Sequence, residues 1–507
     1  MTSEFGRQPN RIRRRARKNV LAITAIVTAV FFLALFGIYE ALPGRLAHGG
    51  APATATSPAT TFYYSDGQTV LGTLSQAGTD PWAPYLVTQA ENELTQVDAV
   101  SQQELETGGL KIVTTISKPA EQEMYKAVDE NIAAVKATPG AQFPWYIRIG
   151  AELQDPRDGE IIAEYPGPGQ DMSAAECRKL DCNLNTAAYT REQVGSTFQP
   201  YVLAAAVADG MNVTTSTLQA SPHLCVPGDA RPAVLSVVMK SLATTCPQGG
   251  YFPVENDGGA IIGNPAKGDG TTVQNALAQS SNTAFTDLTH RVSTVNVIRM
   301  ARNLGVDIAQ YPSGSGLVDD VGEVSLALGS APLTVNEQAT MLSAIADNGV
   351  YHQAHIVKYW HGPGGREQMP AVESHAVLDP SSPANNAELD SQVQYAMEMT
   401  TVDGTGTVAA SGLGGRPIIA KTGTTTSIHS GFFMGAIPQY SLVVGLFTQS
   451  QDVNSPESLV PLTGGGFGGY WPARIWNTFA RAEFASLPRE AFQRPVFTGA
   501  AWNQVGA

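Results

Sequence analysis

Residues 195–210 read GSTFQPYVLAAAVADG, a short polar stretch that runs directly into an apolar one. This change of composition predicts that a helix begins here, and Gly195 permits a tight turn ahead of it. Ser196 then stands at the helix start, with Gln199 one turn later on the same face. A serine at this position is commonly an N-cap, but the helix dipole also suits a reactive hydroxyl there. This stretch alone is compatible with either role.

Two further short motifs follow in the chain. Residues 279–285 read QSSNTAF, and we expect Ser280 and Asn282 to point to one side of a turn or extended segment. There they would offer a proton relay and an amide that can hold a carbonyl. Residues 420–427 read AKTGTTTS and predict a strand on which a ligand lies close to the backbone at a glycine. Each motif taken singly also fits an ordinary polar loop or surface strand.

Taken together and in this order, the three motifs resemble those of the penicillin-binding proteins, whose transpeptidase domain carries S-x-x-K, S-x-N and K-T-G. The resemblance is to the bifunctional class and runs from about residue 108 to 495. It implies a serine β-lactamase/transpeptidase-like fold of the α/β (α+β) class, with an antiparallel sheet flanked by helices and an all-α subregion. The stretches that carry it besides the motifs are DPRDGEIIAEYPG (155–167), SLALGSAPLTVNEQATMLSAIADNGVYHQ (325–353), DGTGTVA (403–409) and GGFGGYWPARIW (465–476).

The resemblance also implies roles for the motif residues. Ser196 would attack the penultimate D-alanine carbonyl of a peptidoglycan stem peptide, or a β-lactam that mimics it, and form an acyl-enzyme. Ser280 and Lys421 would complete the catalytic group. No metal or other cofactor is implied. The substrate-binding residues would be Asn282, Thr422, Gly423 and Thr424, with the threonines facing a carboxylate.

The chain departs from the family pattern at Gln199, where the S-x-x-K motif has its lysine. In the family this lysine takes the proton of the serine, whereas a glutamine has no titratable group. Gln199 can still hydrogen-bond Ser196, but loss of a general base typically costs about 10²- to 10⁴-fold in rate. Lys421 would partly substitute if it took the proton through Ser280.

A second departure concerns the glycosyltransferase domain of the bifunctional class. Residues 63–74 resemble the stretch that precedes this domain, and residues 84–94 resemble the stretch that follows it. About 30 residues between 72 and 102 cannot form a catalytic domain of ordinary size. We therefore expect no glycan polymerisation from this chain.

The N-terminal residues indicate a membrane anchor. Residues 20–39 are twenty residues without a charge, which matches the thickness of a bilayer core, and seven cations precede them in residues 1–19. We expect a cytoplasmic basic tail (1–19), one transmembrane helix (20–39), a tether and small juxtamembrane segment (40–107), an extracytoplasmic transpeptidase domain (108–495) and a C-terminal tail (496–507). A cleaved signal peptide is the alternative, but its apolar region is typically shorter.

The four cysteines are consistent with export, because disulfides form in oxidising compartments. They allow three pairings, and we expect Cys177 with Cys182 and Cys225 with Cys246 because each pair closes a short local loop. Free buried thiols are the alternative. No histidine accompanies them at metal-ligand spacing, so a zinc site is not expected.

Secondary structure is predicted most clearly in the first part of the exported region. Residues 61–74 indicate a hairpin with its turn at Asp66 and Gly67, residues 84–96 an amphipathic helix, and residues 108–116 a strand that leads to a helix over 119–136. Two short strands around a turn at 155–159 and a buried strand over 441–450 are expected later in the chain.

The resemblance, together with the departure at Gln199, leaves three alternative functions. The first is a membrane-anchored penicillin-binding protein that has lost its general base and binds muropeptide or cell-wall synthesis proteins with slow or no turnover. The second is an active D,D-transpeptidase or carboxypeptidase with Lys421 as the base. The third is a β-lactam sensor or hydrolase, although no glutamate is marked for deacylation. The net charge of −14 divides into +6 in residues 1–19 and −20 in the rest of the chain, and an acidic main domain argues against a nucleic-acid groove there.

Overall fold

The computed structural model describes residues 59–503 except 75, 168–182, 228–245, 247–250, 307, 309–323, 363, 426–427, 449–457 and 463–465. The expected transmembrane segment and the pair Cys177 and Cys182 lie outside these residues. Within the described part, no helix is both long and apolar enough to cross a membrane.

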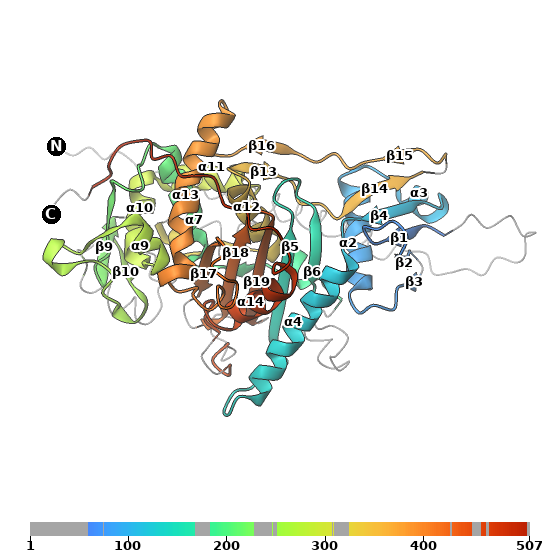
Figure 1. The fold of residues 1–507 in the computed structure, drawn as a ribbon, viewed down its shortest axis with the longest axis horizontal. Coiled ribbons are helices and arrows are strands. Elements are labelled where there is room, and N and C mark those ends of the chain that lie inside the picture. The colour runs from blue at the N-terminus through green and yellow to red at the C-terminus, as the bar shows by residue number, and fades with distance from the viewer. Residues whose placement is uncertain are drawn as a thin grey trace, which may run out of the picture. The chain divides into compact units, whose positions relative to one another are not determined.

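A five-stranded antiparallel sheet, in the order β17-β18-β19-β5-β6, forms the centre of the fold (Figure 1). Its strands alternate side chains between two buried faces, so both faces of β18 and β19 are apolar. β17 lies at one edge of the sheet, which leaves its outer backbone groups unpaired by any described strand. The strands are β5 (Ile147–Gln154), β6 (Ile161–Tyr165), β17 (Ile419–Thr424), β18 (Ser430–Ile437) and β19 (Tyr440–Thr448).

Helices cover both faces of this sheet. α4 (Lys118–Ala137) and α14 (Trp471–Glu483) pack on one face, where Phe433 and Trp476 meet. α12 (Val335–Ala346) packs on the other face, and its capping box at Thr334 and Glu337 fixes its first turn. The expected antiparallel sheet flanked by helices is therefore confirmed.

A helical subregion extends from the α12 side of the sheet and buries a second large part of the core. It contains α7 (Gln199–Ala208), α9 (Val273–Ala278), α10 (Asn282–Val292), α11 (Thr294–Asn303) and α13 (Pro383–Asp403). α7 is apolar all round, and nine of its ten residues are buried, which is typical of a helix inside a core. This subregion carries Gln199 and Asn282, whereas the sheet carries Lys421.

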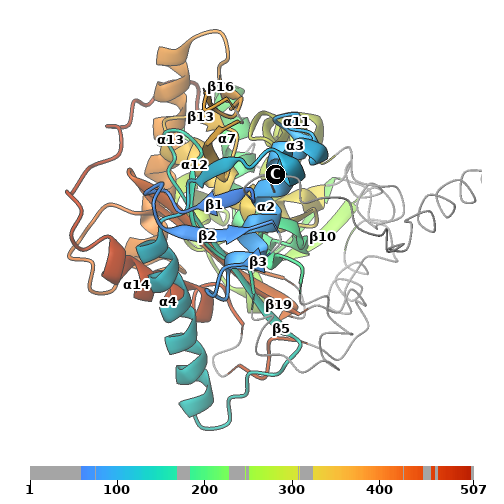
Figure 2. The ribbon, with the colours of Figure 1, turned by 90° about the vertical axis from the view of Figure 1, so that its right-hand side faces the viewer.

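The N-terminal part of the described chain contributes to a separate six-stranded sheet, in the order β15-β14-β4-β1-β2-β3 (Figure 1). α2 packs against this sheet, and Figure 2 shows it beside β1, β2 and β3. The predicted hairpin is confirmed, since β1 (Thr61–Tyr63) pairs with β2 (Val70–Thr73) and Gly67 in the turn has a φ of +64°. The predicted helices correspond to α2 (Ala83–Gln96) and α4, and the predicted strand to β4 (Lys111–Thr114). β14 (Val357–His361) and β15 (Glu367–Gln368) join this sheet from far along the chain, which the sequence did not indicate.

The remaining elements are short. They are β3 (Gln76–Ala77), α3 (Gln102–Thr107), α6 (Thr186–Tyr189), β7 (Glu192–Gln193), β8 (Thr217–Gln219), β9 (His223–Pro227), β10 (Tyr251–Glu255), β11 (Gly270–Thr272), β12 (Pro332–Leu333), β13 (Val350–His352) and β16 (Ser374–Ala376). Among the described residues between β2 and α2, the only regular element is β3.

Candidate active site

Ser196 lies on a 3-10 turn (Gly195–Phe198) that leads into α7. Gly195 has a φ of +60°, and a Cβ there would stand 2.6 Å from the backbone nitrogen of Thr424. Only a glycine therefore allows this turn to lie against β17. Ser196 makes no capping bond to the helix backbone, because the N-cap of α7 is Phe198. This geometry favours a role for Ser196 other than capping.

Gln199 is the first residue of α7, and its side chain is completely buried. Among the described residues, neither its amide nitrogen nor its amide oxygen has a hydrogen-bond partner. The hydrogen bond to Ser196 that the sequence allowed is therefore absent among the described residues, and the only described partner of the Ser196 hydroxyl is Asn282, at a long 3.4 Å. A buried amide without partners costs roughly 1 to 3 kcal/mol of stability, so this position is not optimised for a glutamine.

Lys421 is fully buried on β17, and its Nζ donates to the Oγ of Ser280 at 2.8 Å and to the carbonyl oxygen of Thr422 at 2.9 Å. Ser280 lies in the link between α9 and α10. Its φ of +58° is a left-handed conformation that is uncommon for serine. Burial lowers the pKa of Lys421 to about 7. The lysine is thus able to exist as a neutral amine near neutral pH.

Asn282 begins α10 and connects the serine to the wall of the site. The Oγ of Ser196 donates to its Oδ1 at 3.4 Å, and its Nδ2 donates to the backbone oxygen of Glu255 at 3.1 Å. Asn256, also buried, accepts bonds from the side chain of Ser281 and from both the backbone and side chain of Thr283. Asn256 thereby fixes the first turn of α10, and nothing in the local sequence pattern indicates this role.

Thr422 and Thr424 lie on one face of the edge strand β17, since alternate residues of a strand point the same way. The hydroxyl of Thr422 is 2.6 Å from that of Thr405, and the Oγ1 of Thr424 accepts the backbone N–H of Gly468 at 3.2 Å. Gly423, between them, packs so closely on the serine turn that a Cβ would stand 2.2 Å from the oxygen of Val194. The structure thus brings the residues of all three motifs together.

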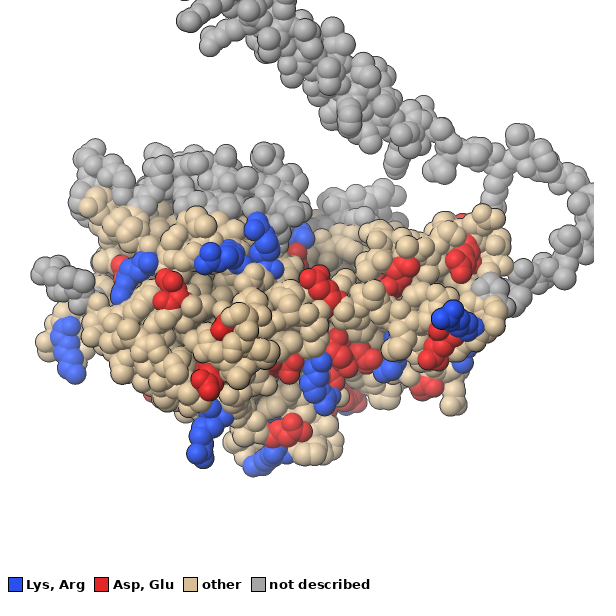
Figure 3. Space-filling model, turned by 90° about the horizontal axis from the view of Figure 1, so that it is seen from above, with Lys and Arg blue, Asp and Glu red and all other residues tan. Residues whose placement is uncertain are grey.

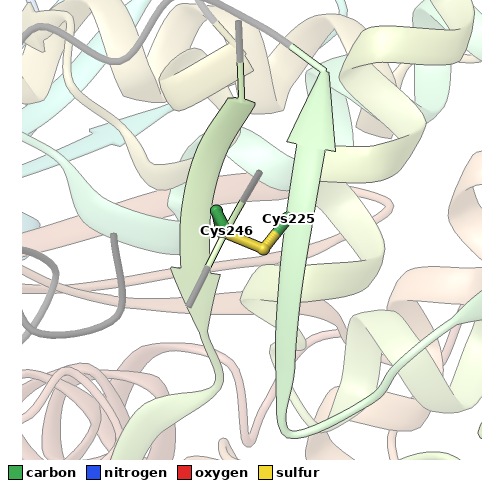
Figure 4. The surroundings of a disulfide bond; sticks show 2 residues. All are labelled: Cys225 and Cys246. Carbon is green, nitrogen blue, oxygen red and sulfur yellow. A yellow bond between two sulfur atoms is a disulfide. The ribbon is translucent and has the colours of Figure 1, made fainter. Parts of the chain in front are cut away.

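The predicted disulfide between Cys225 and Cys246 is present (Figure 4). Cys225 lies on β9, which pairs with β10, and β10 ends at Glu255 beside Asn282. The bond therefore ties β9, one strand of a hairpin that contributes to the wall of the site, to Cys246 in the connection that leads to β10. On the face shown in Figure 3, lysines and arginines lie among aspartates and glutamates, so no continuous basic stripe is visible there.

No group of three or more histidine, cysteine, aspartate or glutamate side chains within the described ranges is arranged to hold a metal ion. The site residues described above supply hydroxyls, amides and one amine, which is the set that acyl transfer to a serine uses. That the chain needs no cofactor stays a prediction.

Comparisons with known proteins agree with this geometry. The sequence model of one protein family, the penicillin-binding protein transpeptidase domain, matches residues 255–454. This range contains Ser280, Asn282 and Lys421 but starts after Ser196. Penicillin-binding protein 1A of Mycobacterium tuberculosis is 24% identical over 425 residues, which is 81% of this chain and 44% of the relative. Penicillin-binding protein 1A of Mycolicibacterium smegmatis is 24% identical over 477 residues, 86% of this chain and 52% of the relative. The chain thus spans about half the length of these curated relatives.

Solved structures share the fold. The penicillin-binding protein PonA1 from Mycobacterium tuberculosis superposes with a TM-score of 0.61 at 22% identity, covering 82% of this chain and 94% of that one. Penicillin-binding protein A from the same organism, as an imipenem acyl-enzyme complex, gives a TM-score of 0.57 at 19% identity, covering 85% and 99%.

Proposed function

This chain carries the transpeptidase domain of the penicillin-binding proteins, and we propose that it acts as a membrane-anchored member of that family whose acylation is severely slowed. The observation that carries the proposal is Gln199, which is buried where the family motif has a lysine and whose amide has no described hydrogen-bond partner. Its role would be to bind peptidoglycan stem peptides or β-lactams outside the cytoplasm, and to assist or regulate cell-wall synthesis.

The proposed chemistry follows from the residues in place. The Oγ of Ser196 would attack the penultimate D-alanine carbonyl, forming an ester while the C–N bond to the leaving amine breaks and the serine proton passes to that nitrogen. Asn282 would hold the substrate, and Thr422 and Thr424 would receive its carboxylate. Gln199 cannot carry the proton, so the step would run about 10²- to 10⁴-fold below the rate expected with a base at this position.

A second candidate function is an active transpeptidase or carboxypeptidase in which Lys421 serves as the base. The contact of 2.8 Å between its Nζ and the Oγ of Ser280, together with its pKa of about 7, favours this candidate. Against it, no hydrogen bond is described between Ser196 and Ser280, and the only described partner of the Ser196 hydroxyl is Asn282, at a long 3.4 Å, so the first step of a relay to Lys421 is not in place. We rank it second for that reason.

A β-lactam sensor or hydrolase ranks third. It would need a group that activates water for deacylation, and none of the site residues described above is a carboxylate. Membrane anchoring through residues 20–39, a cytoplasmic N-terminus and the absence of glycan polymerisation rest on the sequence argument alone and belong to the same proposal.

Labelling with a fluorescent penicillin tests the proposal. The wild-type protein should label slowly or not at all, Ser196→Ala should not label, and both should bind a peptide that ends in D-Ala-D-Ala without forming a covalent bond. Rapid labelling of the wild type would favour the second candidate. Absence of any binding would show that the site does not recognise this class of ligand.

A further inference from the structure

The two threonines of β17 differ from ordinary surface hydroxyls because each already has a partner on the protein side. Thr422 meets the hydroxyl of Thr405 at 2.6 Å, and Thr424 accepts the N–H of Gly468 at 3.2 Å. Thr405 belongs to the loop after α13, and Gly468 precedes α14, so two separate segments converge on the strand. Neither residue belongs to one of the three sequence motifs.

The direction of the bond between Thr405 and Thr422 follows from the surroundings of Thr405. Its hydroxyl has only one other described partner, the carbonyl of Ala278, at a long 3.4 Å. That carbonyl already accepts the backbone N–H of Thr405 at 3.1 Å. A hydroxyl has a single proton to donate, so donation to Thr422 costs the protein little.

When Thr405 donates, the proton of Thr422 is free to point elsewhere. The same holds for Thr424, because it accepts the N–H of Gly468 and keeps its own proton. Two hydroxyls on one face of an edge strand then present two donors. An ionised carboxylate is an acceptor with two oxygens and therefore suits this pair.

We propose that Thr405 and the backbone N–H of Gly468 are positioning groups that orient the hydroxyls of Thr422 and Thr424 as donors toward the carboxylate of the ligand. This inference rests on the proposed function, because the carboxylate is the terminus of the stem peptide or the acid group of a β-lactam. Thr405 and Gly468 thus set a preference for ligands that carry a free carboxylate.

The close packing of the loop that contains Gly468 and Gly469 supports this assignment. A Cβ on Gly468 would stand 2.1 Å from the oxygen of Phe432 and 2.4 Å from that of Gly423. A Cβ on Gly469 would stand 2.3 Å from the oxygen of Thr405. Glycines at both positions let one loop contact β17 and the Thr405 segment at the same time.

The test compares two ligands that differ only at the carboxylate. An N-acetylated peptide ending in D-Ala-D-Ala and its C-terminal amide are titrated by calorimetry into the wild type, Thr405→Val, Thr405→Ser and the control Thr401→Val. The hydroxyl of Thr401 bonds to Glu398 in its own helix, so its loss removes a hydroxyl without touching β17. Thermal melting of each variant checks that it folds.

The wild type should bind the acid more tightly than the amide. Thr405→Val should lower affinity for the acid by about twofold to tenfold, the range for one hydrogen bond, and lower affinity for the amide less, because an amide has one acceptor oxygen where the carboxylate has two. Thr405→Ser and Thr401→Val should keep the wild-type preference. An unchanged preference in Thr405→Val, or an equal loss for both peptides, would overturn the inference and leave the proposed function standing. Failure of the wild type to bind either peptide would overturn both.

Discussion

Lys421 on the central sheet donates a hydrogen bond to Ser280, which lies between α9 and α10 of the helical subregion, with 2.8 Å between Nζ and Oγ. The contact depends on two unusual features, a fully buried lysine and a serine in a left-handed conformation. Burial disfavours the ammonium form of Lys421, so its amine is able to act as a base, and the hydroxyl of Ser280 beside it is able to pass a proton to it. No hydrogen bond is described between Ser196 and this pair, and the only described partner of its hydroxyl is Asn282, at 3.4 Å.

The first prediction concerns the pH dependence of any residual acylation. If Lys421 is the base, the rate of labelling by a fluorescent penicillin should rise with pH through about 7, because burial holds the pKa of this lysine at that value and only the neutral amine accepts a proton. Labelling measured from pH 5.5 to 9 gives the profile. Lys421→Arg keeps the positive charge but cannot lose it, so it should abolish the rise. A profile that is flat in the wild type would exclude Lys421 as the base.

The parts of this structure that sequence reasoning could anticipate are those with a local cause. The hairpin turn at Asp66 and Gly67, the sharp turn at Gly195 and the strand that carries Lys421 each follow from a few neighbouring residues. The motif residues could be named because their order along the chain resembles that of a known family. Their mutual distances could not be derived in this way.

The parts that could not be predicted depend on contacts between distant segments. Asn256 reaches the start of α10, Thr405 reaches Thr422, and β14 joins the N-terminal sheet, and none of these contacts has a periodic or compositional signal. The lack of a described hydrogen-bond partner for the side-chain amide of Gln199 likewise depends on how the core packs around it, and the tetrapeptide Ser196 to Gln199 does not indicate it.

The second prediction concerns a pair of buried carboxyl groups, Glu152 on β5 and Glu164 opposite it on β6. Burial raises the pKa of Glu152 to about 7, and burial together with the charge of Glu152 raises that of Glu164. A raised pKa in the folded state means that the folded protein holds protons that the unfolded chain releases. As pH rises from 4.5 to 7, Glu152 alone should therefore cost roughly 2 to 3 kcal/mol of stability, and Glu164 should add to this loss.

Urea unfolding at several pH values measures this loss. Glu164→Gln should reduce the slope by the share of Glu164 but not abolish it, because burial still raises the pKa of Glu152. Glu123→Gln is the matched control, because Glu123 lies on α4 and pairs with Lys126 near the surface. An equal slope in the wild type and in Glu164→Gln would show that Glu164 does not hold an extra proton in the folded state.

The third prediction concerns the disulfide between Cys225 and Cys246, which closes a loop with a sequence separation of 21 residues. Replacing both cysteines by serine should cost about 3 kcal/mol of stability according to the loop-entropy model. Because β10 ends beside Asn282, the replacement should also weaken binding of a D-Ala-D-Ala peptide. Calorimetric melting and peptide titration measure the two effects. Loss of stability without any change in binding would show that the hairpin does not support the site.

The fourth prediction concerns topology. Seven lysines and arginines precede residue 20, which should keep the N-terminus in the cytoplasm. A reporter that is active only outside the cytoplasm should therefore be active when it is fused after Arg45. The control is a fusion before Val20. There, a reporter that requires the cytoplasm should be active, and one that requires export should be inactive. A secreted soluble product with a new N-terminus near Ala53 would indicate a cleaved signal peptide instead of an anchor.

The fifth prediction isolates Gln199, since one substitution separates a missing base from a pocket that has otherwise changed. Gln199→Lys should speed labelling by a fluorescent penicillin by about 10²- to 10⁴-fold, because it returns a titratable amine to the position one helical turn from Ser196. Gln199→Met is the matched control, with similar length and no polar atoms to satisfy. It should label as slowly as the wild type and gain roughly 1 kcal/mol of stability, because it removes a buried amide that has no described partner.

Ser196→Ala in the Gln199→Lys background should remove the label, which shows that the new amine acts through this serine. A silent Gln199→Lys variant that still binds a D-Ala-D-Ala peptide would mean that more than the base is missing, and that the site serves for binding alone. Equally fast labelling of the wild type and the lysine variant would mean that another base already serves Ser196. Because Lys421 lies 2.8 Å from Ser280, Lys421→Ala should then abolish the label.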